Sequence, residues 1–396
     1  MTAVELERTS FKIEDLWTDR RYRGITIQVL AITALFAFLA YIVDNTISNL
    51  ELLGVETGYG FLNEPASYDI NQRLIEYDSR SSHGRAAIVG LLNTALIAFC
   101  GIIMATLLGF TVGVLRLSGN WLISRIMYCY VEFTRNVPLL LQILLWHGIV
   151  VHSLPRPKNA LEPVSGVFLS NRGFAVPRPN FESGSWLIFV ALIVGIAGAI
   201  FFARYAKRVQ EDTGKHYPVF SINMGLIIGL PVLAFLVAGM PISLDWPALK
   251  GFNFRGGVTV TPEFIALWFA LSVYTASFIS ENVRAGIQAI SHGQTEAAYA
   301  LGLRPNWTMR LVILPQALRV IIPPLISQYL NLTKNSSLAI AVGYMDIVAT
   351  IGGITLNQTG RALECMSIVL TIYLCFSLTI SAVMNWYNKR VALVER

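Results

Sequence analysis

Long apolar runs alternate with polar segments along the whole chain. The first run, residues 24–43, follows Arg20, Arg21 and Arg23 and ends before Asp44. At about 1.5 Å per residue, a helix of this length reaches roughly 30 Å, enough to cross the hydrocarbon core of a bilayer. It is longer than the apolar part of a cleaved signal peptide, so we interpret it as a permanent span. Seven further runs predict spans at residues 88–115, 126–151, 186–205, 222–240, 264–282, 314–332 and 365–386.

The composition supports a membrane protein with several spans. Only 14% of the 396 residues are charged, whereas soluble globular chains are about one quarter charged. So few charges could not cover the water-facing surface of a soluble protein of this length. The sequence therefore predicts an all-α, polytopic membrane protein with about eight transmembrane helices.

The loops between the predicted spans differ in charge. Seventeen Lys and Arg residues lie in the segments on the side of the N-terminus, and nine lie in the loops on the opposite side. Cytoplasmic loops of membrane proteins carry an excess of basic residues, so we expect both termini in the cytoplasm. Residues 1–23 and 389–396 are then cytoplasmic, and residues 44–87 form a periplasmic loop. The net charge of +6 is not gathered into a basic stripe, which argues against nucleic-acid binding.

A second polar segment interrupts the predicted spans. Residues 155–179 are rich in proline, which favours an irregular outer loop. Together with the spans at 186–205 and 222–240, this loop forms an insertion at residues 153–260. The four cysteines lie in or beside apolar runs and lack the spacing of metal ligands. They predict buried, reduced thiols and no metal site.

The polar segment at residues 283–313 contains a short helix with a forced end. Thr295 is a favourable N-cap, and the helix dipole favours Glu296 near a helix N-terminus. Gly302 can take the left-handed conformation that ends a helix, and Pro305 prevents the helix from continuing. The sequence therefore predicts a short helix, a turn and a second short element that leads into the next span.

This segment resembles the EAA coupling motif of ABC importer permeases. The matching positions are Glu296, Ala297, Ala298, Gly302, Leu314 and Pro315. Small side chains at the two alanines favour a helix and would let another protein surface approach closely. The resemblance implies that these residues couple the protein to a cytoplasmic ATPase.

Other stretches resemble the polar amino-acid (histidine/glutamine-type) permeases more narrowly. They are residues 93–94, 116–118, 134–142, 274–286 and 334–338. The resemblance implies a type I ABC importer permease core over residues 88–388, with an extra helix before it and an inserted helix pair. This layout resembles the large Q-type subunits of general L-amino-acid transporters. Asn335 departs from the pattern, because relatives often carry an acid there.

The resemblance also implies a location and partners. In the bacterial inner membrane, an ABC ATPase dimer would bind ATP and Mg, a second permease subunit would complete a heterodimer, and a periplasmic amino-acid-binding protein would deliver the substrate. The sequence has no Gly-x-x-x-x-Gly-Lys-Ser/Thr phosphate loop and no convincing nucleophile triad. We therefore expect this chain to bind no cofactor and not to be an enzyme. The sequence leaves open which L-amino acids are carried.

Polar residues inside the predicted spans are candidates for a translocation path, because such residues usually face a bundle interior or water. The candidates are Asn136, Gln142, Tyr274, Ser277, Glu281, Gln328 and Asn331. Those on the spans at 264–282 and 314–332 recur at helical spacing and share one face of each helix. Hydrogen bonding between helices is an alternative role for them, and a salt bridge with Arg284 is an alternative role for Glu281.

Two other functions fit part of the pattern. An ion-coupled secondary transporter would need carboxylates near mid-bilayer and symmetric interrupted helices, and the sequence shows no such pair. A non-conducting membrane assembly subunit would have similar spans without a path. Recovery together with an ATPase that carries a phosphate loop would favour the importer over both.

Overall fold

The computed structural model describes residues 17, 19–52, 54 and 58–391, so parts of the predicted cytoplasmic segments 1–23 and 389–396 lie outside it. Among the described residues, seven helices are long and apolar enough to cross a membrane, and one bent helix pair would add an eighth crossing. The prediction of a helical membrane protein with about eight transmembrane helices is confirmed. The spans lie in α2 (Arg20–Leu52), α3 (His83–Arg116), α6 (Trp186–Thr213), the run of α7 (Val219–Met224), η3 (Gly225–Gly229) and α8 (Leu230–Val237), α9 (Pro262–Gln288), α12 (Leu314–Asn335) and α14 (Ala362–Val391).

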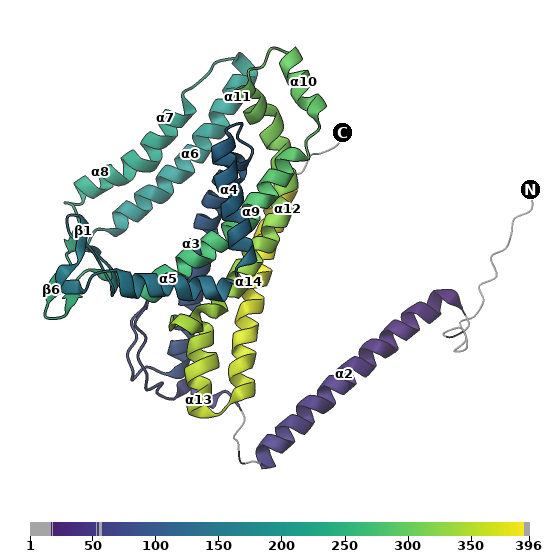
Figure 1. Ribbon diagram of the computed structural model, residues 1–396, viewed down its shortest axis with the longest axis vertical. Coiled ribbons are helices and arrows are strands. Elements are labelled where there is room, and N and C mark those ends of the chain that lie inside the picture. Colours follow the sequence, from purple (N-terminus) through teal and green to yellow (C-terminus); the bar gives the residue numbers. More distant parts are fainter. Residues whose placement is uncertain (1–16, 18, 53, 55–57, 392–396) are drawn as a thin grey trace, which may run out of the picture.

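Helices α3 and α9 form the centre of the fold (Figure 1). They approach closely because α3 has glycines where α9 has branched side chains. A Cβ atom on Gly109 would lie 2.5 Å from Ile279 Cγ2, and one on Gly113 would lie 2.7 Å from Val283 Cβ. Buried apolar side chains of α9 and α12 complete this core, among them Leu267, Leu271, Ile321 and Leu325.

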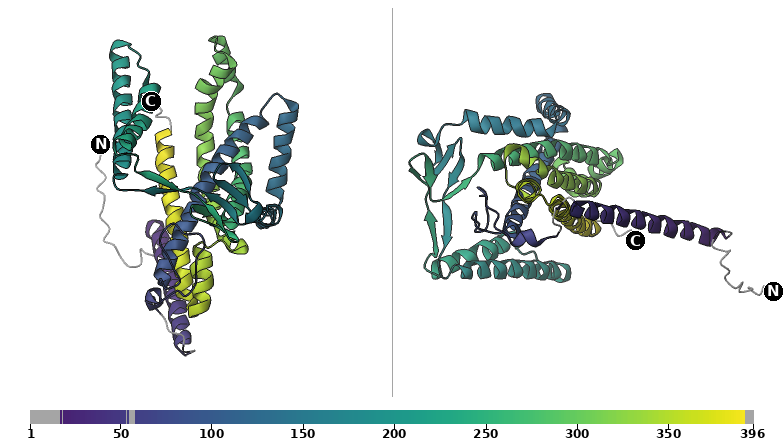
Figure 2. Two further views of the ribbon diagram at one scale, coloured as in Figure 1. Left: turned by 90° about the vertical axis from the view of Figure 1, so that its left-hand side faces the viewer. Right: turned by 90° about the horizontal axis from the view of Figure 1, so that it is seen from below.

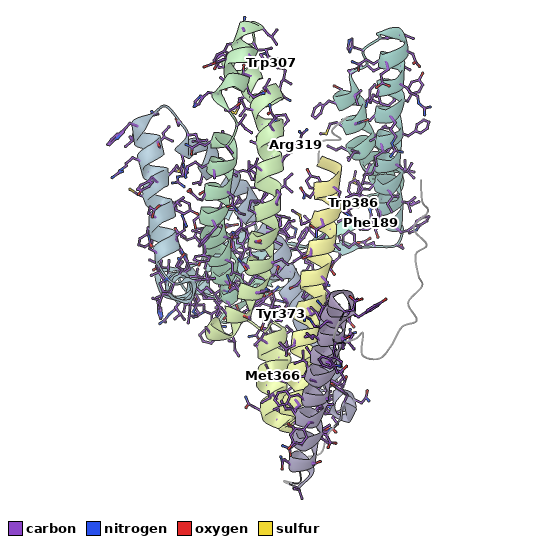
Figure 3. The ribbon with its side chains drawn as sticks, turned by 90° about the vertical axis from the view of Figure 1, so that its right-hand side faces the viewer. Phe189, Trp307, Arg319, Met366, Tyr373 and Trp386 are labelled. Atoms are coloured by element: carbon purple, nitrogen blue, oxygen red, sulfur yellow. The ribbon has the colours of Figure 1, made fainter. Side chains whose placement is uncertain are left out.

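After α12 the chain reverses through short helical turns before it enters α14. Gly343 and Gly360 take positive φ angles of 80° and 69° at these turns, a conformation that glycine adopts at no steric cost. The buried Asp346 accepts a hydrogen bond from the Ala349 N–H (2.9 Å) and one from the Tyr373 hydroxyl (3.2 Å), which ties α14 to the turn (Figure 3). The turns are η5 (Ser336–Val342), η6 (Val348–Thr355) and α13 (Leu356–Thr359).

The predicted span at residues 126–151 is not one continuous helix. The structure has two helices there, α4 (Trp121–Asn136) and α5 (Leu139–Ser153), with an angle of 108° between them. Pro138 causes the break, because proline has no N–H and disfavours a helical residue before it. The buried amide of Gln142 donates hydrogen bonds to two backbone carbonyls at the bend, which satisfies groups that the break leaves unpaired.

The inserted helices pack against each other. Gly195 of α6 allows this contact, since a Cβ atom there would lie 2.4 Å from the Leu226 carbonyl oxygen. Outward side chains of the pair such as Phe189 and Ile193 are exposed, as expected of helices that face lipid. Figure 2 shows the pair standing apart from α3 and α9 and joined to them through strands.

Residues 155–179 are not an irregular loop, as the proline content predicted, but contain β-strands. Strands before α6 pair with strands after α8, so three small antiparallel sheets close the base of the insertion: β1-β2-β3-β8, β4-β5 and β6-β7. We call residues 161–181 and 242–260 the β platform. The elements are η2 (Pro157–Asn159), β1 (Leu161–Val164), β2 (Val167–Ser170), β3 (Gly173–Val176), β4 (Arg178–Phe181), β5 (Ile242–Asp245), β6 (Ala248–Lys250), β7 (Asn253–Arg255) and β8 (Val258–Val260).

The polar segment before α3 folds as a packed cap at the end of the bundle opposite α10. It contains one short helical turn, η1 (Gly60–Asn63). The side chains of Phe61, Ile70 and Tyr77 are buried. Arg361, which precedes α14, donates a hydrogen bond of 2.8 Å to the Gly58 carbonyl oxygen and holds the cap against that helix.

The four cysteines differ in exposure. Cys365 is buried and Cys100 is partly buried, but Cys129 and Cys375 are exposed on α4 and α14. The expectation of buried thiols is therefore wrong for these two residues, because helix faces that meet lipid also accept small apolar side chains. Among the described residues, no group of three His, Cys, Asp or Glu side chains could hold a metal ion.

The glycine contacts of α3 predict a stability effect. Gly113→Ala places a methyl group 2.7 Å from Val283 Cβ, and we expect overpacking to lower the free energy of unfolding by about 1–3 kcal/mol. Thermal denaturation of the detergent-solubilised protein measures the change. Gly148→Ala in α5 is the matched control, because its Cβ would meet nothing within 4 Å. Equal midpoints for the two variants would show that the α3–α9 contact is not tight.

Candidate functional site

The segment between α9 and α12 forms two short helices at one end of the molecule (Figure 1). The first, α10 (His292–Ala300), begins after Ser291, so the predicted N-cap at Thr295 is wrong, and Glu296 lies in the middle of the helix. Gly302 takes a φ of 75°, as predicted. The Gly302 N–H donates to the Tyr299 carbonyl and the Leu303 N–H to the Ala298 carbonyl, so the helix ends in a Schellman motif.

The chain then re-enters the bundle without a loose loop. Pro305 starts α11 (Pro305–Thr308), and η4 (Met309–Ile313) continues directly into α12 at Leu314 and Pro315. The Gln316 amide donates a hydrogen bond of 3.1 Å to the Gln294 side chain, which ties α10 to the first turn of α12. The turn after α10, the unbroken run of α11, η4 and α12, and the Gln316–Gln294 hydrogen bond therefore link α10 to α12.

The surface of this segment is unusually apolar for the end of a membrane bundle. Leu301 is 82% exposed and Trp307 is 51% exposed (Figure 3). Glu296 and Ala297 are exposed as well, whereas Ala298 is buried. An exposed apolar patch next to a charged residue is typical of a protein–protein contact.

Below this segment, a network of charges joins the ends of α3 and α9. The Glu281 carboxylate accepts hydrogen bonds from the guanidinium groups of Arg116 and Arg284. The side chain of Arg116 is only 8% exposed. A buried arginine needs such a partner, because an unpaired charge in a low-dielectric site is costly.

These charges line a polar pocket between α3, α4 and α9, which we call the α3–α4–α9 pocket. Its volume is about 440 Å³. Arg135 enters it from α4 and lies 5.2 Å from the centre of the Phe278 ring. Among the described residues Arg135 forms no ion pair. The lining residues are Arg116, Leu117, Ser124, Tyr128, Glu132, Arg135, Glu281, Arg284 and Gln288.

The pocket contains both kinds of charge that a zwitterion requires. Arg135 can hold a carboxylate through paired N–H groups, and the Glu132 carboxylate can accept hydrogen bonds from an ammonium group. The other charges of the pocket already pair with one another. Charge of both signs in one cavity of this size fits an amino acid better than it fits an ion or an apolar molecule.

Of the seven predicted path residues, only Glu281 lines this pocket. Ser277 is fully buried, and its hydroxyl donates to the Tyr274 carbonyl of its own helix. Gln142 closes the α4–α5 bend, and the Asn136 amide donates to the Glu132 carbonyl. The remaining candidates are Tyr274, whose ring packs against Phe278, the half-buried Gln328 and the exposed Asn331.

The sequence analysis missed Arg116, Glu132 and Arg135 as pocket residues. A signal for them existed, because charged residues within or next to spans usually pair with one another. Arg125, Tyr128, Glu132 and Arg135 also recur at helical spacing on α4 and form a polar stripe. The prediction of one span over residues 126–151 drew attention away from this stripe.

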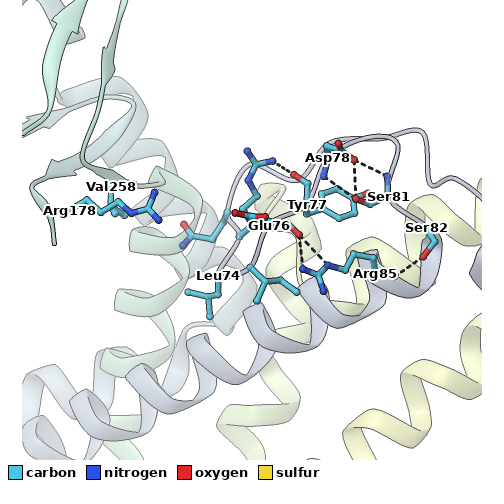
Figure 4. Close-up of a pocket in the computed structure, with 12 residues that line it drawn as sticks. Leu74, Glu76, Tyr77, Asp78, Ser81, Ser82, Arg85, Arg178 and Val258 are labelled. Atoms are coloured by element: carbon cyan, nitrogen blue, oxygen red, sulfur yellow. Dashed lines mark hydrogen bonds between the residues drawn. The ribbon is translucent and has the colours of Figure 1, made fainter. Parts of the chain in front are cut away.

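A second pocket lies at the opposite end of α3, between the cap and the β platform (Figure 4). We call it the outer-loop pocket, and its volume is about 980 Å³. Arg85 donates to the Glu76 carbonyl, and Arg73 donates to the Tyr77 carbonyl. Hydrogen bonds from Ser81 lower the pKa of the Asp78 carboxyl, so this loop carries fixed charges of both signs.

Known proteins resemble this chain over nearly its whole length. Residues 218–393 match the family model of the binding-protein-dependent transport system inner membrane component. The chain is 46% identical to a general L-amino acid transport system permease protein of Rhizobium johnstonii, over 99% of this chain and 98% of the relative. It is 48% identical to a glutamate/glutamine/aspartate/asparagine transport system permease protein of Rhodobacter capsulatus, over 100% of this chain and 99% of the relative.

Solved structures resemble the chain less closely. A crystal structure of an amino acid ABC transporter with histidines matches 78% of this chain and 95% of its own chain, at 20% identity and a TM-score of 0.46. The sequence relatives decide the family, because they match at more than twice that identity over full length. The chain belongs to the amino-acid ABC transporter permease family, whose members are multi-pass inner-membrane transport subunits, not enzymes, that work with an ATPase and a substrate-binding protein.

Proposed function

We propose that this chain is the membrane-spanning subunit of an importer that carries L-amino acids, including acidic and amide amino acids, into the cytoplasm. The observation that carries the proposal is the exposed α10–α11 segment, which combines a rigid helix end at Gly302 with the exposed Leu301 and Trp307. The full-length relatives named for general L-amino acid transport and for glutamate, glutamine, aspartate and asparagine transport support the substrate class.

In this proposal the α10 end faces the cytoplasm and both chain termini lie on that side. The excess of Lys and Arg in the segments on the N-terminal side supports this orientation. Arg204, Arg208 and Lys215 at the end of α6 and in the turn after it contribute to that excess. The cap and the β platform then face the periplasm.

The energy comes from partner subunits. Two ATPase subunits bind ATP and Mg and dock on α10, while this chain binds no cofactor of its own. A second, different permease subunit completes the transmembrane path, and the similarity of this chain to two different glutamate/aspartate import permease proteins of Escherichia coli supports such a pair. Exposed apolar side chains on α5 and α14, such as Leu145 and Leu374, are available to meet lipid or that subunit.

ATP binding would close the ATPase pair and displace α10. The displacement passes through η4 into α12, which packs tightly on α9. A Cβ atom on Gly286 of α9 would lie only 2.3 Å from Ile321 Cγ1 of α12. Because the contact is this tight, the two helices move together and do not slide past each other. Glu281 and Arg284 lie on this part of α9, so the proposed motion alters the pocket that holds the substrate.

The turn after α10 provides a test of coupling. Gly302 has a φ of 75°, which a β-branched side chain adopts only with strain, whereas asparagine tolerates it. We expect Gly302→Val to lower uptake by about tenfold or more and to leave ATP hydrolysis no longer stimulated by binding protein, consistent with a strain of about 1–3 kcal/mol at the turn. Uptake and ATPase assays of the reconstituted transporter measure both.

Gly302→Asn is the matched control and should keep uptake within about threefold of wild type, since asparagine accepts the left-handed conformation. Glu296→Lys reverses the charge on the exposed face of α10 without altering the turn, and it should also uncouple hydrolysis from uptake. Normal coupling in both Gly302→Val and Glu296→Lys would contradict a docking role for this segment.

The α3–α4–α9 pocket provides a test of substrate binding. Arg135 lines the pocket and forms no ion pair with any residue that the structure describes. We therefore expect Arg135→Gln to raise the KM for uptake by about tenfold, the loss of one charge-assisted hydrogen bond of about 1.5 kcal/mol. The control is Arg125→Gln, because the Arg125 guanidinium lies 5.3 Å from the centre of the ring of Tyr128, a pocket residue, but does not itself line the pocket. An unchanged KM in Arg135→Gln would place the substrate elsewhere.

Gln328 and Asn331 remain predicted path residues that the second permease subunit would have to cover. They lie on α12 outside the α3–α4–α9 pocket. We expect Gln328→Ala and Asn331→Ala each to raise the KM for uptake about three- to tenfold, the range of one neutral hydrogen bond. Unchanged affinity and rate in both variants would remove α12 from the path.

A further inference from the structure

The β platform carries an excess of basic side chains on its surface. Six Lys and Arg residues lie in or beside its strands, all exposed, against four acidic residues, Glu162, Glu182, Asp245 and Glu263. Two of these acids are engaged by backbone N–H groups: Glu162 accepts from Gly166 at 2.8 Å, and Asp245 accepts from Gly257 at 3.0 Å. Among the described residues none of the six basic side chains forms an ion pair. They are Arg156, Lys158, Arg172, Arg178, Lys250 and Arg255.

Aromatic side chains lie among these charges and are held in place. Phe252 is 75% exposed, and the Lys158 ammonium lies 4.9 Å from the centre of its ring. Trp246 is 53% exposed and packs on Gly166, where a Cβ atom would lie 2.2 Å from the indole. Exposed aromatic and basic side chains on a rigid frame are the usual content of a protein-binding surface.

The platform is continuous with the outer end of the core. Arg178 of β4 and Val258 of β8 line the outer-loop pocket together with residues of the cap. Figure 4 shows the Arg178 side chain directed toward the cap near Leu74 and Glu76. Contact with lipid alone does not explain why residues of the platform line a pocket together with residues of the cap.

We infer that the β platform is the docking surface for an acidic face of the periplasmic substrate-binding protein. The inference rests on the proposed orientation, in which platform and cap face the periplasm. The family model names a binding-protein-dependent system, so a soluble partner must reach this end of the transporter. Unpaired, exposed charges at the rim of a contact accelerate and orient the encounter, and their effect declines with salt.

The platform therefore sets how readily the binding protein reaches the transporter, whereas α10 sets how the transporter responds. This division predicts that platform variants and α10 variants differ in their transport kinetics. Loss of platform charge weakens productive docking without altering transport once the binding protein is saturating. Loss of coupling at α10 lowers the maximal rate at any concentration of binding protein.

The test uses the complete transporter in proteoliposomes and the periplasmic protein that stimulates its ATP hydrolysis. Uptake of a mixture of labelled L-amino acids is measured while that protein is titrated. For Arg172→Gln/Arg178→Gln/Arg255→Gln we expect the half-saturating concentration to rise about tenfold at about 0.05 M NaCl and by less than about threefold at 0.5 M, with the maximal rate within about twofold of wild type.

The matched control removes three basic residues at the opposite end of the insertion, Arg204→Gln/Arg208→Gln/Lys215→Gln, and should leave the half-saturating concentration unchanged. An unchanged value in the platform variant would overturn the inference while leaving the proposed function intact. A rise in the half-saturating concentration that depends on the anionic-lipid content of the vesicles would also overturn the inference. If no periplasmic protein stimulates the wild-type transporter, the proposed function fails and this inference fails with it.

Discussion

The close contact between α3 and α9 is the interaction on which the rest of the structure depends. In a bilayer, apolar helices gain little from burying apolar surface, because lipid is equally apolar. Their association instead needs close van der Waals packing, which Gly109 and Gly113 provide by removing side chains opposite Ile279 and Val283. The contact fixes the ends of both helices, and so it fixes the distance between Arg116 and the Glu281 carboxylate.

The charge network at those ends has a second consequence. Glu281 accepts hydrogen bonds from Arg116 and Arg284, so the negative charge of its carboxylate is balanced by two guanidinium groups of the same chain. Arg135 has no such partner among the described residues and retains its attraction for an anion. One pocket thus holds a satisfied ion network and one cation that is free to act. In the proposed function, a substrate carboxylate binds to Arg135 without first displacing an internal salt bridge, which would cost several kcal/mol.

The sequence was sufficient for features that repeat over many residues and insufficient for features set by single contacts. The spans were found because apolar runs of about twenty residues leave few alternatives. Gly302 was found because a glycine before a proline marks a helix end. Pro138 marks an interruption in its apolar run, but the 108° angle there does not follow from the sequence, because it depends on the Gln142 hydrogen bonds that make a broken helix acceptable. The β platform was missed because its strands are three or four residues long, and their pairing joins segments separated by two spans.

The bend between α4 and α5 limits the ways in which the transporter can change shape. Its backbone carbonyls are satisfied by Gln142, so straightening the pair would leave those groups unpaired within the bilayer. The glycine contacts on both faces of α9, with α3 through Gly113 and with α12 through Gly286, leave no free volume for sliding. In the proposed coupling, motion that starts at α10 moves α12, α9 and α3 together, because these contacts are tight. In that proposal the charged pocket changes its access mainly through movement relative to the second permease subunit.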